Sequence, residues 1–299
     1  MTGPRAAALL LLVTLAGCSS ESPVAEPPVP SSPPPAATAP ATTATATPSA
    51  APASPTSEPP VPEPGSVPPP WLGTRPLPLR PDGYGRPRPT PPELDPRRFT
   101  LPDRLAPLPG DGFASRVEAV PADVLARSTW EPGCPVGVED LAYVRLAFWG
   151  FDHQRHTGEL LLNASVADDV VGVFRTLYEA RFPFEELRIT SRPELGAAPT
   201  GDGNGTESFV CRPTTGSTTT YSQHAYGLAL DLDPFQNPYL KGDLVLPELA
   251  SSYLDRDHVR PGVITPDGVV VRAFASIGWT WGGTWSSLKD YQHFSQNGR

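Results

Sequence analysis

Prolines dominate the first third of the chain and limit what that part can fold into. The sequence has 299 residues and 42 prolines, and counting along it places 29 of these between Pro23 and Pro109. The same stretch is rich in Ala, Thr and Ser, so it cannot bury enough apolar surface to offset the entropy of ordering. We predict a disordered tether over residues 18–112 and one folded domain over residues 113–299. The sequence does not decide whether residues 71–112 pack on that domain.

The amino terminus has the features of an export signal. Arg5 precedes an apolar run from Ala6 to Ala16, shorter than the roughly 20 residues that a membrane-spanning helix needs. Leu15-Ala16-Gly17-Cys18 then resembles the bacterial lipobox, in which the signal is cut before a cysteine that becomes lipidated. We predict a signal peptide over residues 1–17 and an exported protein, held on the outer face of the membrane by lipidated Cys18 and able to reach the cell wall. The alternative is an ordinary secretory signal peptide with an incidental cysteine.

The charge and the remaining cysteines narrow the possibilities further. A net charge of -9 argues against a nucleic-acid-binding protein, because such proteins neutralise phosphates with clustered basic residues. If Cys18 is lipidated, Cys134 and Cys211 remain, and two cysteines in an exported protein are expected to form a disulfide. The alternative is two separately buried thiols.

The pattern of apolar residues after residue 112 predicts both helices and strands. Alternation and turn residues predict a hairpin, and one-sided apolar positions predict a helix begun by a capping box of Ser165 and Asp168. The predicted strands are 141–150, 159–163, 184–190, 227–233 and two short ones within 278–294; the predicted helices are 117–127, 166–182, 247–254 and 267–277, the last capped by Asp267. The long loop of residues 191–220 is expected to form a wall of an active site.

Two short motifs carry the residue types of a metal site. The first, Ser222-Gln223-His224-Ala225-Tyr226-Gly227-Leu228-Ala229-Leu230-Asp231, places an imidazole and a carboxylate seven positions apart. The second, Lys289-Asp290-Tyr291-Gln292-His293-Phe294, adds another imidazole and another carboxylate. A catalytic zinc takes three protein ligands and leaves a fourth position for water. His224, Asp231 and His293 are therefore candidate ligands and Asp290 is a candidate general base, with two ordinary buried histidines as the alternative.

The two motifs, in this order, resemble those of the zinc D-alanyl-D-alanine carboxypeptidase family. The pattern is Ser-x-His-x-x-Gly-x-Ala-x-Asp followed by Asp-x-x-His, and the flanks Asn237-Pro238-Tyr239 and Trp281-Gly282-Gly283 also fit. This family includes vancomycin-resistance D,D-peptidases and phage L-alanyl-D-glutamate endopeptidases. The resemblance implies an α+β fold of the Hedgehog/D,D-peptidase type, in which helices pack on a small, mainly antiparallel sheet that carries the zinc site.

The resemblance also implies the role of each matching residue. His224, Asp231 and His293 match the zinc ligands, and two imidazoles with one carboxylate leave the ion positively charged. Asp290 matches the catalytic carboxylate, which takes a proton from water and passes it to the leaving amine. Many relatives have Glu at this position, whereas the phage-like branch has Asp.

Two polar residues near the first motif are candidates for contact with a substrate. Arg212 lies roughly where the family carries an arginine, and a guanidinium suits a substrate carboxylate or a developing oxyanion. The alternative is a surface arginine. Ser222 is expected to orient the ligand loop or to contact the substrate rather than to act as a nucleophile.

The leading hypothesis is a lipid-anchored zinc peptidase, expected to be a monomer, that hydrolyses an amide bond in peptidoglycan stem peptides. The bond is either D-Ala-D-Ala, which is cut by a carboxypeptidase, or L-Ala-D-Glu, which is cut by an endopeptidase. The alternative is a non-catalytic, zinc-stabilised lipoprotein that binds the cell wall. The presence of Asp290 favours the enzyme.

Overall fold

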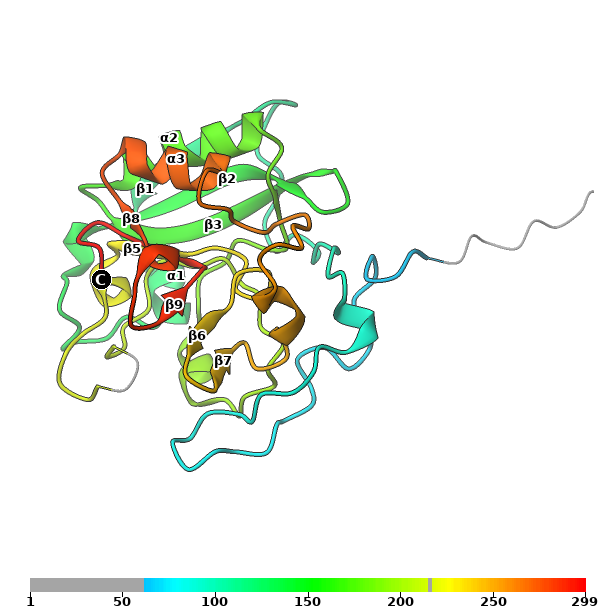
Figure 1. Cartoon of the computed structure of the whole chain (residues 1–299). Helices are drawn as coiled ribbons and strands as arrows, with labels where there is room; N and C mark the ends of the chain where they lie inside the picture. Colours follow the sequence, from blue (N-terminus) through cyan, green and yellow to red (C-terminus); the bar gives the residue numbers. More distant parts are fainter. Residues whose placement is uncertain (1–61, 215–216) are drawn as a thin grey trace, which may run out of the picture. The chain divides into compact units, whose positions relative to one another are not determined.

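A computed structural model describes residues 62–214 and 217–299. These residues form an α+β fold of three small, mainly antiparallel sheets, which confirms the predicted α+β class (Figure 1). The helices and strands are β1 (Ser115–Ala119), α1 (Ala122–Arg127), β2 (Leu141–Gly150), β3 (Arg155–Asn163), α2 (Ala167–Glu179), β4 (Pro183–Phe184), β5 (Ala229–Asp231), β6 (Tyr239–Lys241), β7 (Leu244–Leu246), α3 (Val269–Ser276), β8 (Thr280–Trp281), β9 (Lys289–Asp290) and β10 (His293–Ser295). Within the described ranges, no helix is long and apolar enough to cross a membrane.

The largest sheet is built on the predicted hairpin. β2 and β3 pair along their length, β1 adds to β2 in antiparallel fashion, and β4 adds to β2 in parallel. Both α2 and α3 lie over one face of this sheet (Figure 1). Their apolar side chains join those of the hairpin in the main core, where Val144, Leu160 and Phe174 are each at most 1 % exposed. Burial of such side chains is the main force that holds helices on a sheet.

The helices begin differently from the sequence-based predictions. The proposed capping box of α2 is absent, because the Ser165 hydroxyl bonds to the side chain of Asn163 instead of a backbone amide of the helix. Asp267 does not cap α3, which begins after Gly268. The predicted helix at 117–127 is correct only after Pro121, since β1 occupies its first residues. Proline favours the first position of a helix and cannot lie within it.

Two three-stranded sheets contain the strands from β5 to β10. Their orders are β5–β10–β8 and β7–β6–β9, so the last residues of the chain supply one strand to each. The predicted strands at 184–190 and 227–233 are longer than the observed β4 and β5. In the described chain between β4 and β5, strand pairing is limited to single bridges, such as Leu187 with Thr206. In place of the helix predicted at 247–254 there is a 3₁₀ turn, Ser251–Leu254.

Residues 62–112, which we call the strap, pack on the domain. Leu94 and Phe99 of the strap are buried in a second core with Phe235 and Tyr253. The prediction of a disordered tether through residue 112 is therefore wrong for the strap, because its few apolar side chains find a core among residues far along the chain. Residues 1–61, which include the predicted signal peptide, Cys18 and the rest of the tether, lie outside the described residues.

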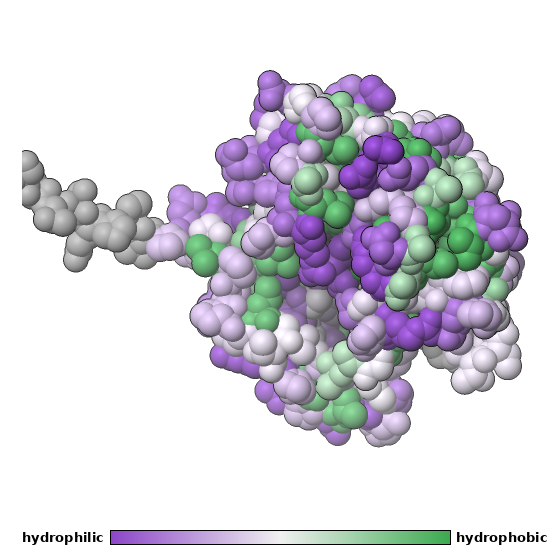
Figure 2. Space-filling view, turned by 180° about the vertical axis from the view of Figure 1, so that it is seen from behind, coloured by the Kyte–Doolittle hydropathy of each residue, from purple (hydrophilic) through white to green (hydrophobic). Residues whose placement is uncertain are grey.

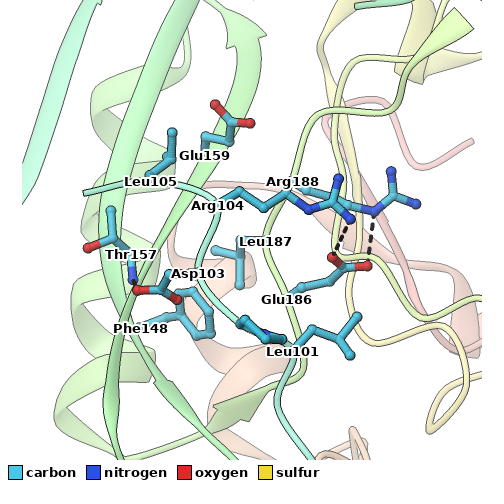
Figure 3. Close-up of a pocket in the computed structure, with 11 residues that line it drawn as sticks. Leu101, Asp103, Arg104, Leu105, Phe148, Thr157, Glu159, Glu186, Leu187 and Arg188 are labelled. Atoms are coloured by element: carbon cyan, nitrogen blue, oxygen red, sulfur yellow. Dashed lines mark hydrogen bonds and ion pairs between the residues drawn. The ribbon is translucent and has the colours of Figure 1, made fainter. Parts of the chain in front are cut away.

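The later part of the strap follows the main sheet. Figure 3 shows Leu101 and Asp103 beside Phe148 of β2 and Thr157 of β3. The backbone amide of Thr157 donates to the Asp103 carboxylate at 3.0 Å. Little space remains between them, because the cavity in Figure 3 has a volume of about 20 Å³. On the face of the molecule in Figure 2, hydrophobic residues lie in small groups among hydrophilic ones, as is normal for a folded domain.

One buried ion pair joins the strap to the rest of the domain. The guanidinium of Arg97 donates to both carboxylate oxygens of Glu185 at 2.7 Å, and each side chain is 1 % exposed. The same guanidinium donates to the Asp202 carbonyl at 2.8 Å and lies 4.5 Å from the ring centre of Phe235. Asn204 donates to Glu185 at 2.7 Å. Removal of one partner of such a pair lowers the free energy of unfolding strongly, because the other partner is left as a buried, unpaired charge.

We expect Arg97→Met to lower the free energy of unfolding by about 3–5 kcal/mol, because it strands the Glu185 carboxylate in the interior. The matched control is Arg98→Met: Arg98 pairs with Glu63 at the surface, with side chains 35 % and 74 % exposed, and its loss costs about 0–1 kcal/mol. Urea unfolding measures both. The double variant Arg97→Met/Glu185→Gln should recover part of the loss. Equal effects of the two single variants would contradict a structural role for the strap.

Candidate metal centre

The pairing of β5 with β10 brings two predicted ligands together. Asp231 ends β5, His293 begins β10, and the register places them directly opposite each other. Opposite residues in an antiparallel ladder have Cβ atoms about 4.5–5.5 Å apart on the same face of the sheet. The two side chains therefore meet, and Nδ1 of His293 lies 3.0 Å from Oδ1 of Asp231.

The third candidate ligand comes from a tight turn before β5. His224 lies in the 3₁₀ turn Gln223–Tyr226, and its backbone amide donates to the Ser222 hydroxyl at 3.3 Å. Gly227 follows with a φ of 67°, and a Cβ at this position would lie 2.4 Å from the backbone nitrogen of Asn163 in β3. Only glycine fits such a position. The glycine of the motif therefore lets the His224 turn rest directly on the main sheet.

The three residues each offer one potential ligand atom, and these atoms lie within 4.8 Å of one another. Nε2 of His224 is 3.2 Å from Nδ1 of His293 and 3.3 Å from Oδ2 of Asp231. Atoms that bind a tetrahedral zinc at about 2.0–2.1 Å are about 3.3 Å from one another. The donor set and its spacing therefore fit zinc. Among the residues that the structure describes, this is the one cluster of His, Cys, Asp or Glu side chains with such geometry.

Each imidazole is held through its other nitrogen by a backbone carbonyl. Nδ1 of His224 lies 2.7 Å from the carbonyl oxygen of Ser208, and Nε2 of His293 lies 3.2 Å from that of Arg299. A carbonyl accepts only, so these nitrogens carry the protons and the opposite nitrogens face the centre. Ligating histidines in metal sites are usually oriented in this way.

The negative charge of the centre belongs to Asp231. Burial opposes its ionisation, but His224 and His293 outweigh burial and lower its pKa. For His224, burial disfavours the protonated imidazole and lowers its pKa. For His293, burial acts in the same direction, but Asp231 outweighs it and raises the pKa. A proton and a metal ion therefore compete for the same nitrogen of His293.

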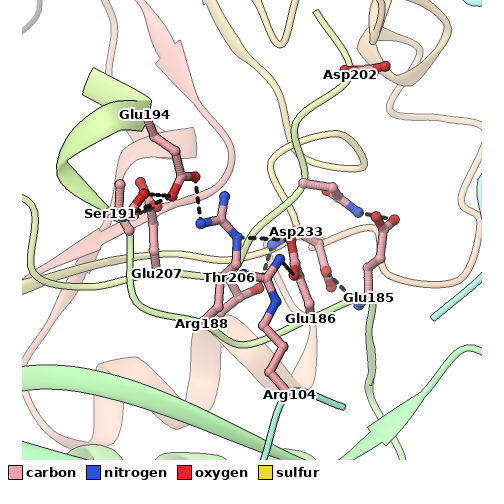
Figure 4. Close-up of polar contacts among 12 residues, drawn as sticks. Arg104, Glu185, Glu186, Arg188, Ser191, Glu194, Asp202, Thr206, Glu207 and Asp233 are labelled. Atoms are coloured by element: carbon pink, nitrogen blue, oxygen red, sulfur yellow. Dashed lines mark hydrogen bonds and ion pairs between the residues drawn. The ribbon is translucent and has the colours of Figure 1, made fainter. Parts of the chain in front are cut away.

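A polar network supports the strand that carries Asp231. The backbone of Glu207 exchanges hydrogen bonds of 3.1 and 2.9 Å with that of Asp231, on the edge of β5 away from β10. Burial raises the pKa of the Glu207 carboxyl to about 7, although Arg188 opposes this shift. Figure 4 shows the Arg188 guanidinium among Glu186, Glu194 and Glu207, and its ion pairs with the first two measure 2.9 and 2.6 Å.

Asp290 lies close to the metal centre, at the end of β9. A Cβ added to Gly282 would lie 2.9 Å from Cβ of Asp290 and 3.4 Å from Cβ of His293, so the backbone of Gly282 lies against both residues. Oδ1 of Asp290 is buried without a hydrogen-bond partner in the described ranges. Burial, and after it the charge of Asp231, raises the pKa of Asp290 to about 7. A carboxyl group that titrates near neutral pH is suited to accept and return a proton.

The three candidate ligands and Asp290 line one cleft of about 440 Å³. The cleft brings together every residue to which the sequence assigned a metal, catalytic or substrate role: Arg212, Ser222, His224, Asp231, Asp290 and His293. The loop of residues 191–220 was predicted to form a wall, but among its described residues only Arg212, Thr214 and Thr220 reach the cleft. The β6–β7 hairpin and the segment before β9 supply another part of the lining.

Arg212 lines this cleft and forms no ion pair with an acidic residue within 62–214 and 217–299. Its one side-chain hydrogen bond within the described residues is to the carbonyl of Pro213, at 3.3 Å. The predicted disulfide between Cys134 and Cys211 is present, with Cα atoms 5.9 Å apart. It ties the residue beside Arg212 to a segment 77 positions earlier in the chain. Arg212 is therefore an anchored cation with capacity for an anion.

Sequence reasoning assigned no role to several residues of the cleft. Trp285 lines the cleft, with its ring centre 5.4 Å from that of His293. Lys241 and Tyr239 of β6 also line the cleft. Only Tyr239 carried a signal, as part of the Asn237-Pro238-Tyr239 flank.

The site thus combines two imidazoles and a carboxylate at zinc-ligand spacing with a second carboxylate in the same cleft. Residues 215–296 match the sequence model of a family described as D-alanyl-D-alanine carboxypeptidase. This range contains both motifs and suggests a hydrolase that acts on peptides. A search of curated proteins and a search of solved structures found no match.

We expect the purified protein to bind about one zinc ion and to become more stable when it does. At a free zinc concentration 100 times the dissociation constant, the gain is about 2.7 kcal/mol, measured as a shift in the thermal midpoint. Lower pH should weaken binding, because the imidazoles must be free of protons at the ligating nitrogens.

His293→Ala and Asp231→Asn should remove this zinc-dependent shift, because each deletes one of the three ligands. The matched control is His258→Ala, since His258 is exposed on the surface. Unchanged zinc binding by His293→Ala, measured by calorimetry, would show that the ligand assignment is wrong.

Proposed function

We propose that this protein is a zinc-dependent peptidase that hydrolyses an amide bond in peptidoglycan stem peptides. The observation that carries the proposal is the convergence of His224, Asp231 and His293 at zinc-ligand spacing, with Asp290 in the same cleft. The match of residues 215–296 to the D-alanyl-D-alanine carboxypeptidase family supports the choice of substrate. The bond is D-Ala-D-Ala or L-Ala-D-Glu.

In this proposal His224, Asp231 and His293 hold the zinc ion. When bound, zinc supplies a Lewis acid that polarises a carbonyl group and makes water more acidic. Asp290 takes a proton from the attacking water and transfers it to the amine that leaves. Oδ1 of Asp290 is buried and has no hydrogen-bond partner in the part of the chain that the structure describes. This supports the role, because such an acceptor is available for the proton of a bound water.

Arg212 binds a carboxylate of the substrate in the same proposal. Both bonds under consideration have a carboxylate on the residue whose amine leaves: the chain end in D-Ala-D-Ala and the α-carboxylate in L-Ala-D-Glu. A guanidinium without an acidic partner suits either carboxylate. Ser222, whose hydroxyl accepts the amide of His224, has the orienting role.

We further propose that the protein is exported as a lipoprotein, anchored through Cys18, and acts as a monomer in the cell wall. The lipobox-like residues Leu15 to Cys18 support the anchor. The disulfide between Cys134 and Cys211 supports export, since disulfides persist mainly outside the reducing cytoplasm.

The zinc-loaded protein should cleave purified muropeptides, and mass spectrometry identifies the bond. Loss of one terminal alanine indicates D-Ala-D-Ala, whereas release of the peptide that begins with D-Glu indicates L-Ala-D-Glu. Asp290→Asn should lower the rate about 10²- to 10⁴-fold with zinc still bound, because it removes the general base. Asp267→Asn, at an exposed position, is the matched control.

Two results would count against these assignments. Full activity of Asp290→Asn would remove Asp290 from the mechanism. Zinc binding with no cleavage of either bond would instead support the non-catalytic, wall-binding lipoprotein.

Arg212→Met should lower kcat/KM about 10- to 150-fold for a substrate with a free carboxylate beside the scissile bond, because a hydrogen bond to a charged group is lost. Arg212→Lys should retain part of the activity, since the charge remains and the two-pronged geometry does not. The control is the same peptide with that carboxylate amidated, on which both variants and the wild type should perform alike. An equal loss on the amidated peptide would indicate a role in the reaction itself or in folding.

A further inference from the structure

Tyr239 lies directly across a β-ladder from the candidate general base. β6 pairs with β9 in antiparallel register, and Tyr239 is opposite Asp290. Opposite residues have Cβ atoms about 4.5–5.5 Å apart and side chains on the same face. Both residues line the cleft that contains the metal centre. The phenol is therefore beside the group to which the proposed function assigns the proton transfers.

The hydroxyl of Tyr239 differs from those of the other buried tyrosines. Buried tyrosine hydroxyls normally have a hydrogen-bond partner. Tyr143 donates to Glu159 at 2.6 Å, Tyr178 donates to the Asp111 carbonyl at 3.1 Å, and the Tyr253 hydroxyl accepts the amide of Arg97 at 2.8 Å. Tyr239 is only 7 % exposed, yet its hydroxyl has no partner among the described residues. Its remaining exposure is toward the cleft that it lines.

The backbone that carries Tyr239 is held on several sides. The fully buried Asn237 donates to three carbonyls, including that of Gly262 at 2.9 Å, and accepts the amide of Ile264 at 2.8 Å. The carbonyl of Pro238 accepts the amide of Tyr291 at 3.4 Å, and β7 pairs with the other edge of β6. Asn237 and Pro238 thus fix the position from which the phenol projects, which gives the Asn237-Pro238-Tyr239 motif a physical function.

The phenol is suited to donate a hydrogen bond. Burial, and then the charge of Asp290, raises the pKa of Tyr239 and keeps the hydroxyl protonated. Attack of water on an amide places negative charge on the carbonyl oxygen, and fixed donors directed at that oxygen lower the barrier. Asp290 only accepts when ionised, so it cannot supply this donor.

We propose that Tyr239 is a further catalytic residue, whose hydroxyl donates a hydrogen bond to the oxygen of the scissile amide as that oxygen becomes negative. The inference rests on the proposed function, because it concerns the same cleft and the same reaction. Tyr239 forms no bond and exchanges no proton in this role. It acts beside Asp290, which carries the proton from water to the leaving amine.

The test is Tyr239→Phe in the zinc-loaded protein, with muropeptides as substrates. Removal of one such donor should lower kcat about 10²-fold, while KM stays within about threefold. Zinc content and thermal midpoint should not fall, because the hydroxyl bonds to no described residue of the fold. Tyr178→Phe is the matched control, since it removes a buried hydroxyl in α2 that does not line the cleft.

A binding measurement separates this inference from the proposed function. Phosphinate dipeptides that mimic D-Ala-D-Ala and L-Ala-D-Glu resemble the charged transition state, and calorimetry on zinc-loaded protein should give an affinity about 10²-fold lower for Tyr239→Phe. If the wild type cleaves the substrate and Tyr239→Phe has the same kcat, the inference about Tyr239 is overturned while the proposed function stands. A raised KM with an unchanged kcat would also overturn it, because the contact would then serve binding. If the wild type cleaves neither bond, the proposed function fails. If, in addition, the wild type and Tyr239→Phe bind the phosphinates equally or not at all, the inference about Tyr239 is overturned as well.

Discussion

The pairing of Asp231 with His293 in the β5–β10 ladder is the contact on which the site depends. Antiparallel pairing puts opposite side chains on one face at a nearly fixed separation, so the register alone brings a carboxylate and an imidazole within 3.0 Å. A slip of either strand by one residue would turn the side chain of that strand to the other face and separate the pair. The remaining site residues are arranged around this pair: His224 by a turn that rests on β3, and Asp290 through β9, three residues before His293.

Polar groups buried near this ladder require partners, and the fold supplies them from distant parts of the chain. Glu207 pairs with the free edge of β5, and its carboxyl lies near Arg188. Two residues beyond Asp231, the Asp233 carboxylate accepts the amide of Glu185 at 3.1 Å, and Glu185 is paired in turn with Arg97 of the strap. A segment that begins before the predicted domain thereby stabilises the loop that follows β5. The functional unit is larger than the motifs indicate.

The sequence predicted some levels of this structure better than others. The β2–β3 hairpin and α2 were predicted correctly as elements, because their apolar patterns are long, although β3 begins at Arg155 rather than at 159 and α2 ends at Glu179 rather than at 182. Helix caps were predicted less well: Ser165 has a competing partner in Asn163, which only the folded chain shows. The strap was mistaken for tether because its composition resembles that of the preceding residues. Its apolar side chains, such as Leu94 and Phe99, are few, and their partners Phe235 and Tyr253 lie far along the chain.

For the site, the sequence by itself determined the candidate residues. Two motifs named the residues that converge, and the residue types alone indicated a metal centre with a nearby carboxylate, because few other arrangements use two imidazoles and two acids at such spacing. The tertiary structure decided which other residues share the cleft. Lys241, Trp285 and Tyr239 line it through the pairing of short strands and the path of the last segment. Strands of two or three residues have no periodicity from which a face can be predicted, so the place of Tyr239 beside Asp290 follows only from the register of β6 with β9.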